Sequence, residues 1–300
     1  MSVSRSTTFL CCAMAIAGFA TRAAAQAKSA PSPVVPSTTA SGTADRAKIL
    51  RGAADALGMV RWSDIGGGNT RLPGIDVINT MEFKATGTSY TAGQPVPAEY
   101  DVELAYNPPG MRVQTVRSGA HTIQTVREDY AWDESELGAG LVPGKGTATP
   151  QVSAAKDRIL QLWTLPYGVV KAAIAAGDKT IVSTADGATV LTFPLSGPLS
   201  GVTVKATLDA NNFITRVETK SGDPALNTES EYSDYADHGE IATDIKSPAH
   251  IVRKQAGRPV MDIRVKTWDA NNPYVVFPVP SNIKKAAAPA GAAAPHQENQ

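Results

Sequence analysis

Carboxylates and a histidine crowd one short stretch of the chain, and this is the mixture of side chains that a divalent metal site uses. The stretch contains Glu229, Glu231, Asp234, Asp237, His238 and Glu240. Such groups bind calcium or zinc only when their oxygen and nitrogen atoms converge. A spacing of two places Glu229 and Glu231 on one face of a strand and Tyr232 on the other. We therefore predict a solvated strand face here and no metal site.

Two classes of hydrolase, serine hydrolases and glycosidases, require residue patterns that can be compared with this sequence. A nucleophile elbow needs Gly-x-Ser-x-Gly between a strand and a helix, whereas Gly197-Pro-Leu-Ser-Gly201 has a different spacing and leads into a strand. Carboxylate pairs of the kind that glycosidases use are present at Glu128, Asp129, Asp133 and Glu134. Acids are, however, common on exposed hairpins. We expect a non-enzymatic protein with no catalytic residues and no cofactor. An enzyme with an unrecognised site is the minor alternative.

The N-terminus indicates export. Arg5 precedes an apolar run from Phe9 to Ala20, and Ala23-Ala24-Ala25 follows with the small residues that signal peptidase requires. The run has 12 residues, fewer than the roughly 20 of a membrane-spanning helix. We therefore predict a signal peptide over 1–25, cleaved near Ala25, and a periplasmic or secreted protein that does not span the membrane.

Cleavage would remove the two cysteines of the chain, Cys11 and Cys12, so the mature protein would have no disulfide and no Cys-ligated zinc. Loss of Arg5 and Arg22 leaves 26 of the 28 basic residues against 28 acidic ones. The basic residues form no run longer than a pair such as Lys284-Lys285. This charge pattern does not favour nucleic-acid binding.

Composition divides the mature chain into a domain and two tails. Residues 26–44 are rich in Pro, Ser and Thr and read as a flexible linker, and 284–300 read as a disordered Ala/Pro tail. The part between them, 45–283, is long enough for one sizeable core. We predict a single domain there.

Two segments have helical patterning. Thr43 to Leu57 places apolar residues at helical spacing, and Ser153 to Ala176 does so over a broader face. The second segment contains Leu165-Pro-Tyr-Gly168, and proline cannot donate the helix hydrogen bond. We therefore predict two helices there instead of one.

Most other segments alternate with a period of two, which predicts antiparallel strands. Asp186-Gly187 predicts a tight hairpin turn, and Asp209-Ala-Asn-Asn212 predicts a second turn through its self-bonding side chains. About ten strands with two or three helices favour a mainly β (α+β) fold, in which a strongly curved antiparallel sheet, or half-barrel, wraps around the helices. A sandwich is the second choice.

Five segments carry a resemblance to a known family: Arg216-Val-Glu-Thr-Lys220, Asp223-Pro-Ala-Leu226, Glu231-Tyr-Ser-Asp-Tyr235, Pro248-Ala-His-Ile-Val-Arg-Lys-Gln255 and Pro259-Val-Met-Asp-Ile-Arg-Val265. They resemble the N-terminal module of exported metallo-β-lactamase-fold hydrolases, which is similar in turn to the LolA/LppX lipoprotein-carrier half-barrel. Gly87-Thr-Ser-Tyr90, Gly93-Gln94 and Leu165–Ala173 are supporting matches.

The chain departs from that family at two points. Tyr167 stands where the family often has histidine. We expect the hydrolase domain to be absent here, and its binuclear zinc site needs closely spaced histidines with an aspartate. The four histidines of this chain, His121, His238, His250 and His296, are isolated from one another.

The resemblance implies a groove, because carriers with this architecture hold acyl chains inside a half-barrel. We expect a lipid-like or other apolar ligand, lined by aromatic side chains that could equally be core: Trp62, Tyr90, Tyr130, Trp132, Trp163, Tyr167 and Phe193. The alternative is an accessory module that binds a protein partner, namely a separately encoded metallo-β-lactamase-fold hydrolase.

Overall fold

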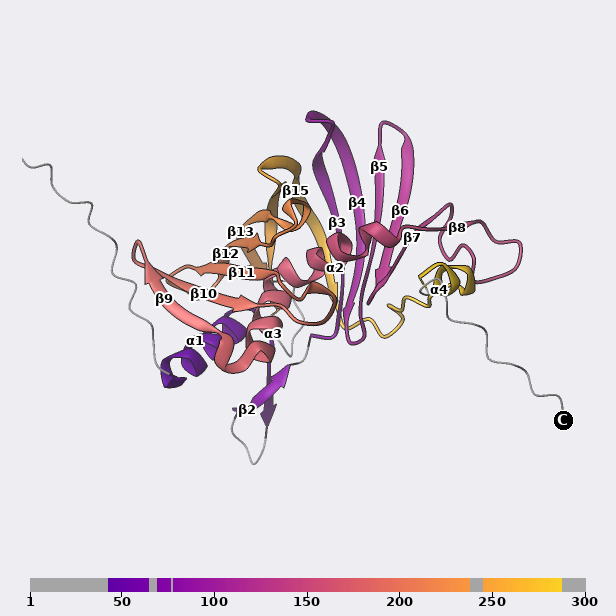
Figure 1. Cartoon of the computed structure of the whole chain (residues 1–300). Coiled ribbons are helices and arrows are strands. Elements are labelled where there is room, and N and C mark those ends of the chain that lie inside the picture. Colours follow the sequence, from indigo (N-terminus) through magenta and orange to yellow (C-terminus); the bar gives the residue numbers. More distant parts are fainter. Residues whose placement is uncertain (1–42, 65–68, 77, 238–244, 288–300) are drawn as a thin grey trace, which may run out of the picture. The chain divides into compact units, whose positions relative to one another are not determined.

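One open antiparallel sheet organises the chain, and its strand order divides it into two meanders. The structure is a computed structural model that describes residues 43–64, 69–76, 78–237 and 245–287. In this part of the chain the sheet has 13 strands in the order β8-β7-β6-β5-β4-β3-β15-β14-β13-β12-β11-β10-β9. Strands that follow one another in the chain are neighbours within each meander, and the meanders join where β3 pairs with β15 (Figure 1).

The first meander contains β3 (Thr80–Thr91), β4 (Gln94–Tyr106), β5 (Pro109–Arg117), β6 (Ala120–Arg127), β7 (Tyr130–Glu134) and β8 (Ala148–Pro150). The second contains β9 (Ile181–Ala185), β10 (Ala188–Pro194), β11 (Thr203–Leu208), β12 (Ile214–Lys220), β13 (Thr228–Asp237), β14 (Lys246–Gln255) and β15 (Arg258–Ala270). A separate pair consists of β1 (Val60–Asp64) and β2 (Asn69–Asp76). The prediction of a mainly β fold with an antiparallel, unclosed sheet is confirmed.

The alternation of apolar and polar residues explains why these segments form strands. In β11, Val204 and Ala206 are buried whereas Thr203 and Lys205 are exposed, so one face of the strand meets the core and the other meets water. The predicted Asp186-Gly187 turn joins β9 to β10, and both residues have positive φ, as a tight hairpin requires.

The helices are α1 (Thr43–Ala56), α2 (Ala155–Thr164), α3 (Pro166–Ala176) and α4 (Ser281–Ala287), with short 3-10 turns η1 (Val152–Ala154), η2 (Gly177–Lys179), η3 (Gly197–Leu199) and η4 (Pro224–Leu226). The predicted break between α2 and α3 is confirmed. Leu165 has an extended backbone (ψ 151°) because the ring of Pro166 excludes the helical conformation from the residue before it.

The connection from β8 to β9 joins the two opposite edges of the sheet. Thirteen strands laid flat would span roughly 58 Å at about 4.8 Å per neighbour. The two helical arms, Val152–Thr164 and Pro166–Lys179, are bent by 94°. At about 1.5 Å per residue these arms reach only roughly 30 Å from end to end. The sheet must therefore curl around the helices that connect its edges.

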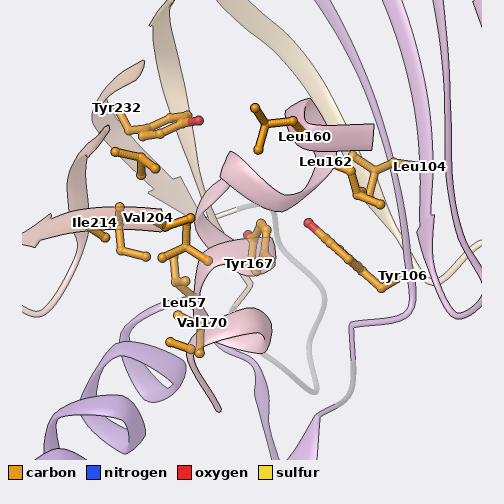
Figure 2. Packing of buried hydrophobic residues seen from close by; sticks show 14 of the residues in the cluster. Leu57, Leu104, Tyr106, Leu160, Leu162, Tyr167, Val170, Val204, Ile214 and Tyr232 are labelled. Carbon is orange, nitrogen blue, oxygen red and sulfur yellow. The ribbon is translucent and has the colours of Figure 1, made fainter. Parts of the chain in front are cut away.

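The core lies between the helices and the inner face of this curled sheet. Leu160 and Leu162 of α2 belong to the same buried cluster as Leu104 of the first meander and Val204 of the second. Figure 2 shows side chains of both meanders facing the helical segment. The helices thus bury apolar surface from both halves of the sheet at once.

The C-terminal segment packs on the outer face of the first meander. Phe277 lies over Gly110 of β5, where a Cβ atom would come within 2.6 Å of the ring. Ile283 of α4 is buried with Trp132 and Ala148. Helix α4 continues to Ala287, so helical structure extends beyond the predicted domain end at residue 283.

Among the described residues, no single helix is both long and apolar enough to cross a membrane; only the bent pair Val152–Thr164 and Pro166–Lys179 passes that test of length and composition when taken together.

Replacing Gly168 with alanine tests the close approach of α3 to α2. The added Cβ would overlap the carbonyl oxygen of Leu162 and lie 3.0 Å from the Cα of Trp163. We expect Gly168→Ala to lower the free energy of unfolding by about 1 to 3 kcal/mol, measured by urea denaturation. Gly222→Ala is the control, because nothing lies within 4 Å of its added Cβ, and it should change stability by less than about 0.5 kcal/mol. Equal stabilities of the two variants would contradict the packing described for the α2–α3 junction.

Candidate functional site

A cavity of about 220 Å³ lies between α2 and the inner face of the sheet, and we call it the inner cavity. Its roof is formed by Asp157, Arg158, Gln161 and Thr164 of α2. Its floor comes from β3, β4, β5 and β6 of the first meander and from β13, β14 and β15 of the second. The cavity therefore spans the join between the two meanders.

One end of the floor is apolar. Phe83 of β3 pairs with Val102 of β4, and Val102 pairs with Val113 of β5, so three apolar side chains form a row across three strands. Met111 lies two residues before Val113 and faces the same way. All four side chains line the inner cavity. This end of the cavity can hold an apolar group.

The other end of the floor is cationic. Arg253 of β14 pairs with Met261 of β15, and Met261 pairs with Ser89 of β3. The hydroxyl of Ser89 accepts a hydrogen bond from Nη1 of Arg117 at 3.4 Å. Strand register thus brings Arg117 and Arg253, which are far apart in sequence, to the same end of the inner cavity.

Arg253 is buried in the cavity wall, with 7% of its surface exposed. Its Nη2 lies 3.3 Å from Oδ1 of Asp157, and the same oxygen accepts a shorter bond of 2.7 Å from Nε2 of Gln255. Nε of Arg253 has no hydrogen-bond partner within the described residues. Burial lowers the pKa of Arg253 and the carboxylate of Asp157 opposes this shift, but a guanidinium keeps its charge at neutral pH.

Arg158 lines the same cavity and is fully engaged in holding α2 to the sheet. Its Nη1 donates to the carbonyl oxygens of Thr125 and Trp132 at 3.2 and 2.7 Å, and its Nη2 donates to Oδ1 of Asp133 at 2.6 Å. These contacts fix the position of α2 over the first meander.

Two tyrosines anchor the junction between α2 and α3. The hydroxyl of Tyr232 donates to the carbonyl oxygen of Thr164 at 2.7 Å, which satisfies one of the unpaired carbonyls at the end of α2. The hydroxyl of Tyr167 donates to the carbonyl oxygen of Lys246 at 2.7 Å and lies 2.6 Å from Oγ of Ser247. Burial raises the pKa of Tyr232 to about 12 and the pKa of Tyr167 further still. Both hydroxyls therefore keep their protons at neutral pH.

A second and larger space of about 930 Å³ lies at the rim of the sheet, and we call it the rim cleft. It is bounded by the β4–β5 and β6–β7 turns, by residues 194–201 and by α2 and α3. The rings of Tyr106 and Trp163 lie 5.9 Å apart there, and Nζ of Lys171 lies 4.8 Å from the centre of the Tyr106 ring. The cleft is formed largely by turns, and its lining includes the charged residues Glu128, Asp129, Lys171 and Lys179.

The structure distributes the seven predicted ligand-lining aromatics over several places. Trp132 is buried on the outer face, where its Nε1 donates to Oε1 of Glu134 at 3.0 Å, and Tyr130 packs beside it. Tyr167 and Phe193 belong to the core between helices and sheet. These four side chains lie outside the inner cavity and the rim cleft.

The remaining three predicted aromatics are also dispersed. Trp163 lines the rim cleft. Tyr90 is half-buried on β3 opposite Pro95 and lines neither space. The structure gives the backbone of Trp62 within β1, and its side chain lies outside what is described. Contact between these aromatics and a ligand stays a prediction.

Sequence reasoning missed the polar residues of the inner cavity, above all Arg117, Arg253 and Asp157. A signal for one of them is present in the chain. In β14, Ile251, Arg253 and Gln255 share one face, so an arginine occupies a position that alternation assigns to the interior. An arginine at an inward position of a strand is therefore the sequence signal for a polar cavity wall.

The acidic stretch behaves as predicted where it is described. Glu229 and Glu231 make ion pairs with Lys254, at 3.0 and 3.7 Å, while Tyr232 is buried on the opposite face. Hydrogen bonding to Lys254 lowers the pKa of Glu229. His238 and Glu240 lie outside the described residues. Within the described part of the chain, no three His, Cys, Asp or Glu side chains are placed to hold a metal ion.

One Ser/His/Asp row lies on the outer face of the second meander. Nε2 of His250 lies 2.8 Å from Oδ1 of Asp262, and its Nδ1 lies 3.4 Å from Oγ of Ser233. The three residues come from adjacent paired strands, and none of them lines the inner cavity or the rim cleft. We describe the row as cross-strand pairing on a surface of the sheet.

The fold and its cavity define an open antiparallel half-barrel with helices on the inner face and a small internal space. No known protein-family profile matches the sequence, and no curated protein matches it. Among solved structures, the chain is similar to the lipoprotein LppX of Mycobacterium tuberculosis, with 12% identity, 60% of this chain and 90% of that chain covered, and a TM-score of 0.23. At that score the likeness carries no argument about the site. The association with metallo-β-lactamase-fold hydrolases stays a prediction.

The buried phenol of Tyr232 predicts how stability depends on pH. Above pH 10 an unfolded tyrosine loses its proton, whereas Tyr232 in the folded chain keeps it until about pH 12. Rising pH therefore stabilises the unfolded state by deprotonating its tyrosine, and it does not stabilise the folded state in this way. The free energy of unfolding should consequently fall between pH 10 and 12. For Tyr232 alone the slope is at most about 1.4 kcal/mol per pH unit. Urea denaturation from pH 8 to pH 11.5 measures it.

Tyr232→Phe is the control for this titration. It should lose about 1 kcal/mol at pH 8 with the hydrogen bond to Thr164, and it should show a shallower decline above pH 10 than the native chain. Parallel curves for the two proteins above pH 10 would mean that Tyr232 titrates normally.

Proposed function

We propose that this chain is an exported, non-enzymatic binding protein that holds a small, largely apolar ligand in the inner cavity. The observation that carries the proposal is the roofed space of about 220 Å³ with the apolar row Phe83, Val102 and Val113 in its floor. Enclosed apolar pockets with a few polar groups are the usual form of small-molecule sites. The signal-like N-terminus described above supports export.

The size of the cavity narrows the ligand. An engineered apolar cavity of about 150 Å³ accommodates benzene, which has six carbon atoms. By that scale, a cavity of about 220 Å³ has room for about nine non-hydrogen atoms. A ring with a short substituent or one short chain fits this space.

The groups around the cavity favour binding over catalysis. Tyr232 keeps its proton at neutral pH because its pKa is about 12. Arg158 has its hydrogen bonds committed to the first meander. A general base or acid requires a pKa near the working pH, and Tyr232 does not have one.

Filling the cavity tests the proposal. Val113 points into the inner cavity, and Val116 of the same strand lies on the solvent side with 40% of its surface exposed. We expect the native chain to bind 1-octanol, which has nine non-hydrogen atoms, and Val113→Phe to weaken that binding at least tenfold because the ring occupies the space. Val116→Phe, the matched control, should bind as the native chain does. Titration calorimetry measures all three proteins.

Failure of the native chain to bind 1-octanol would sink this proposal. The accessory-module hypothesis, in which the chain docks on a protein partner, would then take its place.

A further inference from the structure

The inner cavity contains more positive than negative charge. Three arginines line it, Arg117, Arg158 and Arg253, against one carboxylate, Asp157. The charge of Arg158 is matched by Asp133 at 2.6 Å. Among the described residues of the lining, Asp157 is the one acid, and it pairs with Arg253 at 3.3 Å. One positive charge is therefore left over at this end of the cavity.

Arg253 has a buried hydrogen-bond donor that lacks a partner within the described residues. A guanidinium has five N–H donors in a rigid fork. The described partners of Arg253 use Nη2 alone, at 3.3 Å from Asp157, and its buried Nε has no partner. A buried donor without an acceptor costs about 1 to 3 kcal/mol. An acceptor delivered by a ligand would remove that cost.

The carboxylate of Asp157 is shared between Arg253 and two side-chain amides. Its Oδ1 takes the shorter bond from Gln255, at 2.7 Å, and its Oδ2 lies 3.5 Å from Nε2 of Gln161. Asp157 thus engages Nη2 of Arg253, whereas Nε of Arg253 has no partner within the described residues. Arginine binds carboxylates best through two parallel N–H bonds.

Polarity changes along the cavity in one direction. On the inner face of β5, the order Met111, Val113, Thr115, Arg117 runs from apolar to cationic, and these side chains share a face because they are two residues apart. On β3, Phe83 lies at the apolar end and Ser89 at the cationic end. A ligand that matches this surface has an apolar body and one anionic end.

Resting on the function proposed above, we infer that the ligand of the inner cavity is a small amphiphile with a single carboxylate. Its head accepts hydrogen bonds from the guanidinium of Arg253, in the cavity that Arg117 also lines, and its apolar body lies toward Phe83, Val102 and Val113. A carboxylate is preferred to a phosphate monoester, because one unmatched positive charge balances one negative charge and a phosphate carries nearly two.

The test compares two ligands of the same size and different charge. Heptanoate and heptanamide both have nine non-hydrogen atoms, and the amide lacks the charge. At pH 7.5 we expect the native chain to bind heptanoate at least tenfold more tightly than heptanamide, by titration calorimetry. Arg253→Met should reduce the two affinities to within about twofold of each other, while heptanamide binds as before.

Two further variants control the comparison. Arg264 lies on β15 with its side chain 61% exposed and pairs with Asp234, so Arg264→Met removes a surface charge and should keep the preference for heptanoate. Arg117→Met should reduce the preference at least threefold, and it decides the matter if Arg253→Met fails to give the circular dichroism spectrum of the native chain.

The outcomes separate this inference from the proposed function. Equal binding of heptanoate and heptanamide to the native chain would overturn the inference and leave the apolar site standing. Binding of neither heptanoate, heptanamide nor 1-octanol would overturn both. A preference for heptanoate that survives in both Arg253→Met and Arg117→Met would show that other groups bind the carboxylate and would overturn the assignment to this pair.

Discussion

The short helical connection between β8 and β9 is the constraint on which the structure depends. It leaves one edge of the sheet and enters the opposite edge, and its two arms are bent by 94°. Because such a connection reaches about half the width of a flat sheet of this size, the strands must curl around it. The curvature, the covered inner face and the core that belongs to both meanders all follow from this single crossing.

The bend in that connection determines where the cavity lies. Pro166 forces Leu165 out of the helical conformation, and Gly168 allows α3 to press against the end of α2. Tyr232 of the second meander binds the C-terminal end of α2 at Thr164. Arg158, near the start of α2, binds the first meander at Trp132. Fixed at both ends, α2 forms a roof over the join of the two meanders, and the space beneath it is the inner cavity. The site is therefore a product of the crossing and not of any local motif.

The sequence predicted the fold through local signals, whereas ligand contact by the predicted aromatics stays a prediction. Alternation, the Asp186-Gly187 turn and the break at Leu165 are local signals, and each produced the element expected from it. The aromatic residues were chosen for their large apolar area, but that same area drives Trp132 beneath the C-terminal segment and Phe193 into the core. Local patterns do not indicate that Arg117 and Arg253 line one cavity, because this depends on the pairing of β3 with β15 and of β15 with β14.

By itself, the sequence determined which residues alternate, where the chain turns and where the helix breaks. It also determined that acidic side chains share one face of β13. All of these features depend on neighbours within a few positions. Only the tertiary structure decided that β3 pairs with β15, that the helices cover the inner face and that Arg117 and Arg253 line the same cavity. The physical reason is that the alternation of apolar and polar residues defines two faces for each strand. It does not determine which strand lies beside it or in which register the two pair. Those are fixed when the whole sheet buries its apolar face against the helices that connect its edges.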